Sequence, residues 1–164
     1  MTAKDVLPAE INGTRIVDRA VGHVASKTGA GSLRDALAEV CGGNLEAYLY
    51  FRYALAKEAA REVASICDGV NSAFLFLENR CESFPGEPVL LGLVVSRKTA
   101  ALQSLVDSVC EAVKREVARR IPALASFDSV LSVEIMDSES LSARAGVAAL
   151  VNSIDEPPIQ VWPQ

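Results

Sequence analysis

Hydrophobic residues repeat along this chain with two spacings, one typical of helices and the other typical of strands. The helical spacing, with apolar positions three and four residues apart, occurs over residues 14–27, 33–40, 44–66 and 99–121. In the last range these positions form one continuous stripe, made of Leu102, Leu105, Val106, Val109, Cys110, Val113, Val117 and Ile121. Each range is therefore predicted to be a helix with an apolar surface in the core.

Residues at the ends of these ranges support the same boundaries. Ser32 stands directly before the second range and Asn44 is the first residue of the third; at each position a side-chain oxygen can accept a hydrogen bond from a free amide of the first turn. Pro122 follows the fourth range and cannot continue a helix. The third range has apolar residues on more than one face, which predicts burial on two sides or a contact between subunits.

Short runs rich in apolar and β-branched residues predict strands over residues 70–77, 88–95 and 130–136. The second run is apolar throughout, so both of its faces should be covered and it should lie at the centre of a sheet. The third run alternates between polar and apolar residues, as an outer strand does. Residues 159–162 lie between prolines and fit a short edge strand.

Ser138 is expected to cap a further helix over residues 139–154. The resulting order, α-α-α-β-β-α-β-α with a final β, predicts an α/β fold in which a mixed sheet of three or four strands is packed with helices. A chain of 164 residues fits a single domain. The only seam is the glycine-rich break at residues 29–31, so residues 1–43 are expected to form a helical appendage on an α/β core over 44–164.

The composition limits the classes of protein that remain. Half of the residues are hydrophobic and 5% are aromatic, which predicts an aliphatic core and excludes intrinsic disorder. A net charge of −5 disfavours a nucleic-acid partner. No stretch reaches the roughly 18 apolar residues of a membrane span, and the first residues do not resemble a signal peptide, so we expect a soluble, cytoplasmic protein. A low content of Asn and Gln is a weak sign of a thermophile.

The side chains that most often carry chemistry are few and scattered. Four cysteines stand far apart without a C-x-x-C pair: Cys41, Cys67, Cys81 and Cys110. We therefore expect buried, reduced thiols and no metal site. The single histidine, His23, has Asp18 and Lys27 at helical distances but forms no recognisable dyad, so a surface or partly buried imidazole is expected.

Charged residues near the strand ends are candidates for a binding site. Arg97 and Lys98 directly follow the central strand and could hold an anion. Glu134 and Asp137 lie near the end of the third strand, where acids can bind metal in α/β sheets. The loop between the first two strands is surrounded by further acids, namely Glu78, Glu82 and Glu87. Solvated carboxylates are the commoner finding at all these acidic positions.

A basic group occupies the last turns of the fourth predicted helix: Lys114, Arg115, Arg119 and Arg120. Cations there oppose the negative end of the helix dipole. The spacing also allows two i,i+4 ion pairs, Glu111 with Arg115 and Glu116 with Arg120. A solvated helix face would account for the whole group.

Over residues 44–162 a helix is followed by a strand, a loop, a second strand, a helix, a third strand and a final helix. Glu78-Asn79-Arg80 follows the first strand, the second strand carries no acid, and the third carries Glu134. This order resembles the minimal nucleotidyltransferase domains, which have a Gly-Ser turn after the first strand, two metal-binding aspartates on the second and often an acid on the third. Because nucleotidyl transfer needs clustered carboxylates to hold a divalent metal, the resemblance implies a degenerate, non-catalytic member.

These observations predict a non-catalytic interaction or regulatory domain that self-associates or binds a protein partner. No cofactor, metal, membrane or nucleic-acid partner is expected. The alternative is a nucleotide- or metal-binding enzyme of nucleotidyltransferase-like fold that uses the strand-end residues Arg97, Lys98, Glu134 and Asp137.

Overall fold

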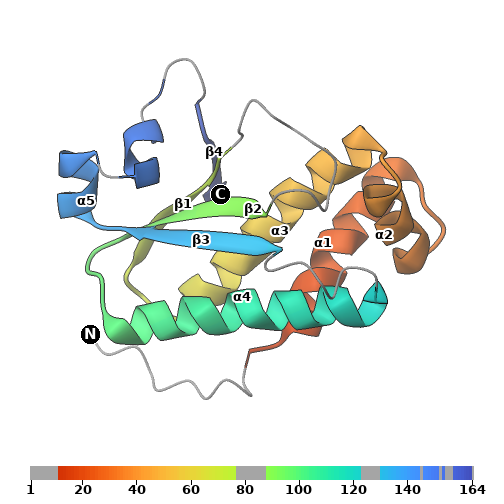
Figure 1. Cartoon of the computed structure of the whole chain (residues 1–164), viewed down its shortest axis with the longest axis horizontal. Helices are drawn as coiled ribbons and strands as arrows, with labels where there is room; N and C mark the ends of the chain where they lie inside the picture. The colour runs from red at the N-terminus through yellow and green to blue at the C-terminus, as the bar shows by residue number, and fades with distance from the viewer. Residues whose placement is uncertain are drawn as a thin grey trace.

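The computed structural model describes residues 11–76, 88–122, 130–144, 146–151, 153 and 157–163, and it confirms the predicted α/β class (Figure 1). The elements are α1 (Gly13–Thr28), α2 (Leu33–Cys41), α3 (Leu45–Ile66), β1 (Val70–Phe76), β2 (Val89–Val95), α4 (Ala100–Arg120), β3 (Leu131–Met136), α5 (Ser138–Ala143), the 3-10 helix η3 (Gly146–Leu150) and β4 (Ile159–Trp162). Among these helices, none is long and apolar enough to cross a membrane.

The four strands form one mixed sheet in the order β3-β2-β1-β4. β2 pairs in parallel with β3 and antiparallel with β1, and β4 pairs antiparallel with β1. The predictions of a central second strand, an outer third strand and a short edge strand are therefore confirmed. Helices α3 and α4 contact the sheet, and α1 and α2 pack against them.

Helices α2 and α3 begin after Ser32 and Asn44, as predicted, and α4 begins one residue after the predicted start at Thr99. The side chains of Ser32, Asn44 and Thr99 each accept a hydrogen bond from a backbone amide of the first turn of α2, α3 and α4. These bonds satisfy amides that have no partner inside the helix. The helix starts and the apolar spacing could therefore be read from the sequence to within a residue or two.

The final helix is present, but it is shorter than predicted. α5 ends at Ala143, where Arg144 adopts a left-handed conformation, and a separate 3-10 helix follows. Its cap is Asp137 rather than Ser138, because the Asp137 carboxylate accepts from the Ser140 amide at 2.8 Å. Through α5 and the 3-10 helix, Leu141, Ala148 and Leu150 cover the face of the sheet opposite α3 and α4. Ile154, the predicted end, lies outside the described residues.

The broad apolar surface of α3 is largely used inside the chain. Its buried residues are Ala47, Tyr48, Phe51, Arg52, Ala54, Leu55, Ala56, Ala59, Ala60, Glu62 and Val63. They face α1 on one side and the sheet on the other. Of the large apolar residues on α3, Leu45 and Leu49 remain exposed, at 53% and 40%.

A glycine allows α1 to approach α4 closely. A Cβ at Gly13 would lie 2.5 Å from the carbonyl oxygen of Ala112, so a larger residue would force the two helices apart. Buried residues of α1 and α2 belong to the same hydrophobic cluster as those of α3, α4 and the sheet. The division of the chain at residue 43 stays a prediction.

Candidate functional site

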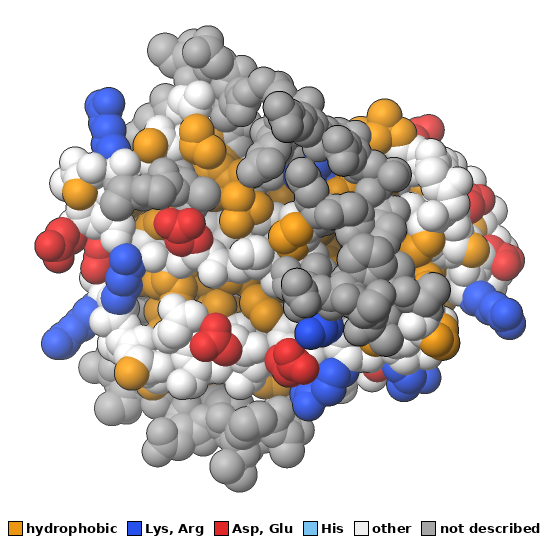
Figure 2. Space-filling view, viewed as in Figure 1, with side chains coloured by type: hydrophobic (Ala, Val, Ile, Leu, Met, Phe, Trp, Pro, Cys, Tyr) orange, Lys and Arg blue, Asp and Glu red, His pale blue; other side chains and the backbone are white. Residues whose placement is uncertain are grey.

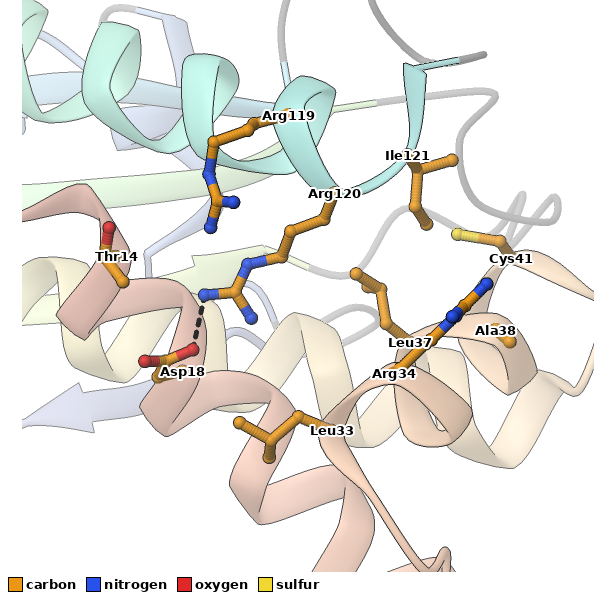
Figure 3. A pocket seen from close by; sticks show the side chains of 10 residues that line it. All are labelled: Thr14, Asp18, Leu33, Arg34, Leu37, Ala38, Cys41, Arg119, Arg120 and Ile121. Carbon is orange, nitrogen blue, oxygen red and sulfur yellow. Dashed lines mark hydrogen bonds and ion pairs between the residues drawn. The ribbon is translucent and has the colours of Figure 1, made fainter.

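A groove lies between α1, α2 and the C-terminal end of α4 (Figure 3). Its volume is about 800 Å³, within the usual range of small-ligand pockets. The side chains that line this α1–α2–α4 groove are Thr14, Asp18, Leu33, Arg34, Leu37, Ala38, Cys41, Arg119, Arg120 and Ile121.

The two sides of the groove differ in polarity. Helix α2 supplies most of the apolar lining through Leu33, Leu37, Ala38 and Cys41, and Ile121 at the end of α4 adds to it. Polar side chains from α1 and the last turn of α4 occupy the opposite side, where Figure 3 shows the Arg120 guanidinium directed toward Asp18. The arrangement offers apolar contact on one wall and hydrogen-bond donors on the other.

Glu116 connects the polar side chains of the groove through hydrogen bonds. This carboxylate is 8% exposed and accepts hydrogen bonds from Thr14 Oγ1 at 3.1 Å, from Arg119 Nη2 at 2.6 Å and from Arg120 Nε at 2.8 Å. The bonds from Arg119, and then those from Arg120 and Thr14, lower the pKa of Glu116 from 4.5 to about 2, although burial opposes this shift. Glu116 is therefore charged at neutral pH and fixes both arginines.

Arg120 joins α4 to α1 and is the most enclosed of the groove arginines. Its Nη2 donates to Asp18 Oδ1, and its side chain is only 16% exposed. Its Nη1 has no hydrogen bond with the residues that the structure describes, and Figure 3 shows the guanidinium beside the open space of the groove. The guanidinium is therefore held in place before any ligand arrives. The prediction that this basic group forms a purely solvated helix face is wrong for Arg120.

Helix α1 is also fixed on its other side. Arg15 forms an ion pair with Glu62 of α3 at 2.6 Å, and Arg19 forms one with Glu58 at 3.6 Å. With Thr14 and Asp18 bound to α4, four polar residues of α1 are tied to two different helices. The α1 wall of the groove is thus anchored by tertiary contacts rather than by α1 alone.

Arg34 and Arg119 complete the positive side chains of the groove. The Arg119 side chain is 67% exposed and pairs with Glu116. Arg34 is exposed and forms no ion pair with any residue that the structure describes. Figure 2 shows basic and acidic side chains gathered side by side along α4. Arg34 is therefore the lining cation whose charge is not balanced by a described neighbour.

The strand-end candidates lie at the other end of α4. Arg97 and Lys98 are exposed between β2 and α4, whereas the groove begins about 30 Å away at the far end of this helix of 21 residues. Because β2 and β3 run in parallel, their carboxyl ends lie at the same edge of the sheet, and Lys98 and Asp137 both follow these ends. Glu134 lies in the middle of the outer strand β3, opposite Gly92 of β2, so it does not share that edge.

Asp137 already has a structural role at that edge. Its carboxylate accepts from the Ser140 amide and from Ser140 Oγ at 3.0 Å. These bonds, in that order, and the nearby Lys98 lower the pKa of Asp137, although desolvation opposes them. A binding role for Arg97, Lys98, Glu134 and Asp137 stays a prediction.

The described thiols are free, and the His23 imidazole is in contact with aromatic rings. Cys41, Cys67 and Cys110 are half-buried free thiols, and burial raises the pKa of Cys41 to about 11. The imidazole of His23 is near the rings of Tyr50 and Tyr53, with centroids 6.0 and 5.9 Å away, and burial followed by Lys27 and Lys57 lowers its pKa.

No three His, Cys, Asp or Glu side chains gather as a metal site within the described part of the chain. Cys81, Glu78, Glu82 and Glu87 lie outside the described residues. The groove itself was missed by sequence reasoning, although one signal was present. Glu116 stands four residues after Ala112 and three after Val113, so an acid falls on the apolar stripe of α4.

No protein-family model, no curated protein and no solved structure matches the chain. The resemblance in element order to the minimal nucleotidyltransferase domains accordingly stays a prediction.

Proposed function

We propose that this chain is an interaction domain that binds an apolar, negatively charged ligand in the α1–α2–α4 groove. One observation carries the proposal: three arginines and an apolar wall line the same groove. The apolar wall would supply binding free energy by removing ligand surface from water. The arginines would select for negative charge and orient the ligand.

The fixed position of Arg120 supports this proposal. A guanidinium that is held by Glu116 and Asp18 loses little side-chain entropy when a ligand binds. A surface arginine with no such contacts would have to be ordered first, at a cost of about 0.5–1.5 kcal/mol. The groove is in this respect organised before binding.

The test uses the dye anilinonaphthalene sulfonate, an anion with an apolar body that fluoresces when it leaves water. Titration of the folded protein should show one saturable site with a stoichiometry of one dye per chain. Ala38→Trp should remove that site because Ala38 is an exposed lining residue and the indole would fill the groove. Ala101→Trp, at an exposed position near the start of α4 and outside the groove, is the matched control.

The two variants separate specific binding from general stickiness of the protein. The proposal is supported if Ala101→Trp keeps the dye site and Ala38→Trp loses it, with unchanged near-ultraviolet circular dichroism in both. Equal dye binding by both variants, or the absence of a saturable site in the wild type, would overturn it.

Self-association remains part of the proposal, although α3 exposes less apolar surface than the sequence implies. The apolar residues of α3 are mostly buried within the chain, and Leu45 and Leu49 are the large ones left exposed. A contact between copies through α3 would have to use these two leucines.

The rival proposal, a nucleotide-binding enzyme, draws on the presence of Lys98 near Asp137 at one edge of the parallel strands. It predicts that ATP with Mg²⁺ raises the melting temperature, since a ligand at a hundred times its Kd contributes about 2.7 kcal/mol. Lys98→Ala should remove that shift. A flat response of the wild type would count against the rival proposal.

A further inference from the structure

The ionic pairing inside the groove points to the charge of its ligand. Arg34, Arg119 and Arg120 supply three positive charges, and their partners Asp18 and Glu116 supply two negative ones, which leaves one positive charge. We infer that the ligand is a monoanionic carboxylate on an apolar body. This inference rests on the proposed function, because it names the class of ligand that the same groove would take.

A single negative charge suits the groove better than a double one. Glu116 and Asp18 already hold Arg119 and Arg120, so Arg34 is the cation that a ligand would neutralise. A phosphate monoester carries about −1.5 to −2 at neutral pH and would leave surplus negative charge. The Asp18 side chain, 44% exposed and among the lining residues, would repel that surplus.

The shape of the donors favours a carboxylate. A guanidinium presents a planar fork of N–H groups that matches the two oxygens of a carboxylate. Arg120 offers Nη1 from a fixed position, and Arg34 lines the same groove from α2. Figure 3 shows the Arg34 guanidinium directed toward Cys41 and the Arg120 guanidinium directed toward Asp18, with Leu37 between them. With the carboxylate on Arg34, the apolar body would lie along Leu37 and Ile121.

The experiment compares three ligands that share one eight-carbon chain: octanoate, octanol and octyl phosphate. Each is used to displace anilinonaphthalene sulfonate from the full-length chain at low ionic strength. Octanoate should displace the dye at a concentration at least about tenfold lower than octanol, which is the order expected for a charge-assisted hydrogen bond. Octyl phosphate should displace it less well than octanoate.

Arg34→Gln tests the residue that the inference assigns to the carboxylate. This variant should lose most of the preference for octanoate over octanol while its affinity for octanol stays unchanged. Arg115→Gln removes an exposed arginine of α4 that does not line the groove, and it should keep the preference. Arg34 is exposed, so its replacement should leave the fold intact.

A free fatty acid and the C-terminus of an apolar protein tail both present this chemistry. Acetyl-trileucine with a free carboxylate and its amidated form distinguish the two sources. Displacement by the free peptide and not by the amide, at lower concentrations than octanoate, assigns the groove to a protein terminus. Stronger displacement by octanoate assigns it to a fatty acid, and both results support the inference.

The failure of the inference is distinct from the failure of the proposed function. If octanol or octyl phosphate competes as well as octanoate while Ala38→Trp still abolishes dye binding, the groove binds ligands but the carboxylate assignment is wrong. If Ala38→Trp leaves dye binding unchanged, the proposed function itself is wrong.

Discussion

Glu116→Gln should destabilise the fold by removing the charge at the centre of the contact between α1 and α4. The fall in the pKa of Glu116 from 4.5 to about 2 corresponds to roughly 3 kcal/mol between its charged and neutral forms. Part of that value is screened by water, because the Arg119 side chain is 67% exposed. We therefore expect the variant to lose about 1–2 kcal/mol of unfolding free energy at neutral pH.

The loss should depend on pH with a definite sign. A carboxyl whose pKa is lower in the folded state stabilises the protein fully above its unfolded pKa, near 4.5, and progressively less as the pH falls toward 2. Urea unfolding of wild type and variant at a series of pH values should therefore show a constant gap at higher pH. By pH 3 less than half of the gap should remain.

Glu111→Gln provides the control, since Glu111 is exposed on the same helix and its neutralisation should change stability by less than about 0.5 kcal/mol. A Glu116→Gln variant as stable as the wild type would refute the reasoning. So would a gap of the same size at pH 7 and pH 3, because the loss would then come from packing and not from charge.

Three other predictions follow from single positions. Gly13→Ala should lower the unfolding free energy measured in urea by about 1–3 kcal/mol, because its Cβ would meet the Ala112 backbone. Gly22→Ala, whose Cβ would have its nearest neighbour at 3.9 Å, should raise the unfolding free energy by up to about 1 kcal/mol, and equal effects of the two variants would contradict the close approach of α1 and α4. Cys41, with a pKa of about 11, should be alkylated by iodoacetamide more slowly than a free thiol at pH 8, and the rate measured by mass spectrometry should keep rising up to pH 11; a plateau already reached near pH 10 would show an ordinary thiol. If α3 carries a contact between copies, light scattering should give a mass above 17.4 kDa for the wild type and 17.4 kDa for Leu49→Glu, and a wild-type mass of 17.4 kDa would remove the self-association proposal.

The sequence predicts those parts of the fold that depend on local rules. Helices α2 and α3 begin where Ser32 and Asn44 can cap them, and β2 is central because an entirely apolar strand must be covered on both faces. The helix predicted over 139–154 is too long because a periodic pattern does not reveal that Arg144 turns the chain and that a 3-10 helix follows over the sheet. Packing against the sheet decides that geometry, and the local spacing of apolar residues does not contain it.

The α1–α2–α4 groove could not be predicted for the same reason. The ion pair that joins its α1 and α4 walls is between Asp18 and Arg120, which are 102 positions apart, and no local rule relates them. The i,i+4 rule does predict the pair between Glu116 and Arg120, and that pair is present at 2.8 Å. The other pair that this rule allows, between Glu111 and Arg115, is not among the ion pairs of the residues that the structure describes.

The buried position of Glu116 determines which arginine of the groove is left for the proposed ligand. Glu116 lies on the buried side of α4, so its arginines are fixed and largely neutralised once α1 packs against the helix. In the sequence the basic group on α4 stands out, even though Glu116 can pair with Arg120, whereas Arg34 is an ordinary residue of the first turn of α2. Tertiary packing reverses this order, because it balances the basic end of α4 and leaves Arg34 as the unpaired lining cation of the described groove. Selectivity for a negative charge should therefore follow Arg34, and the number of arginines on α4 should matter less.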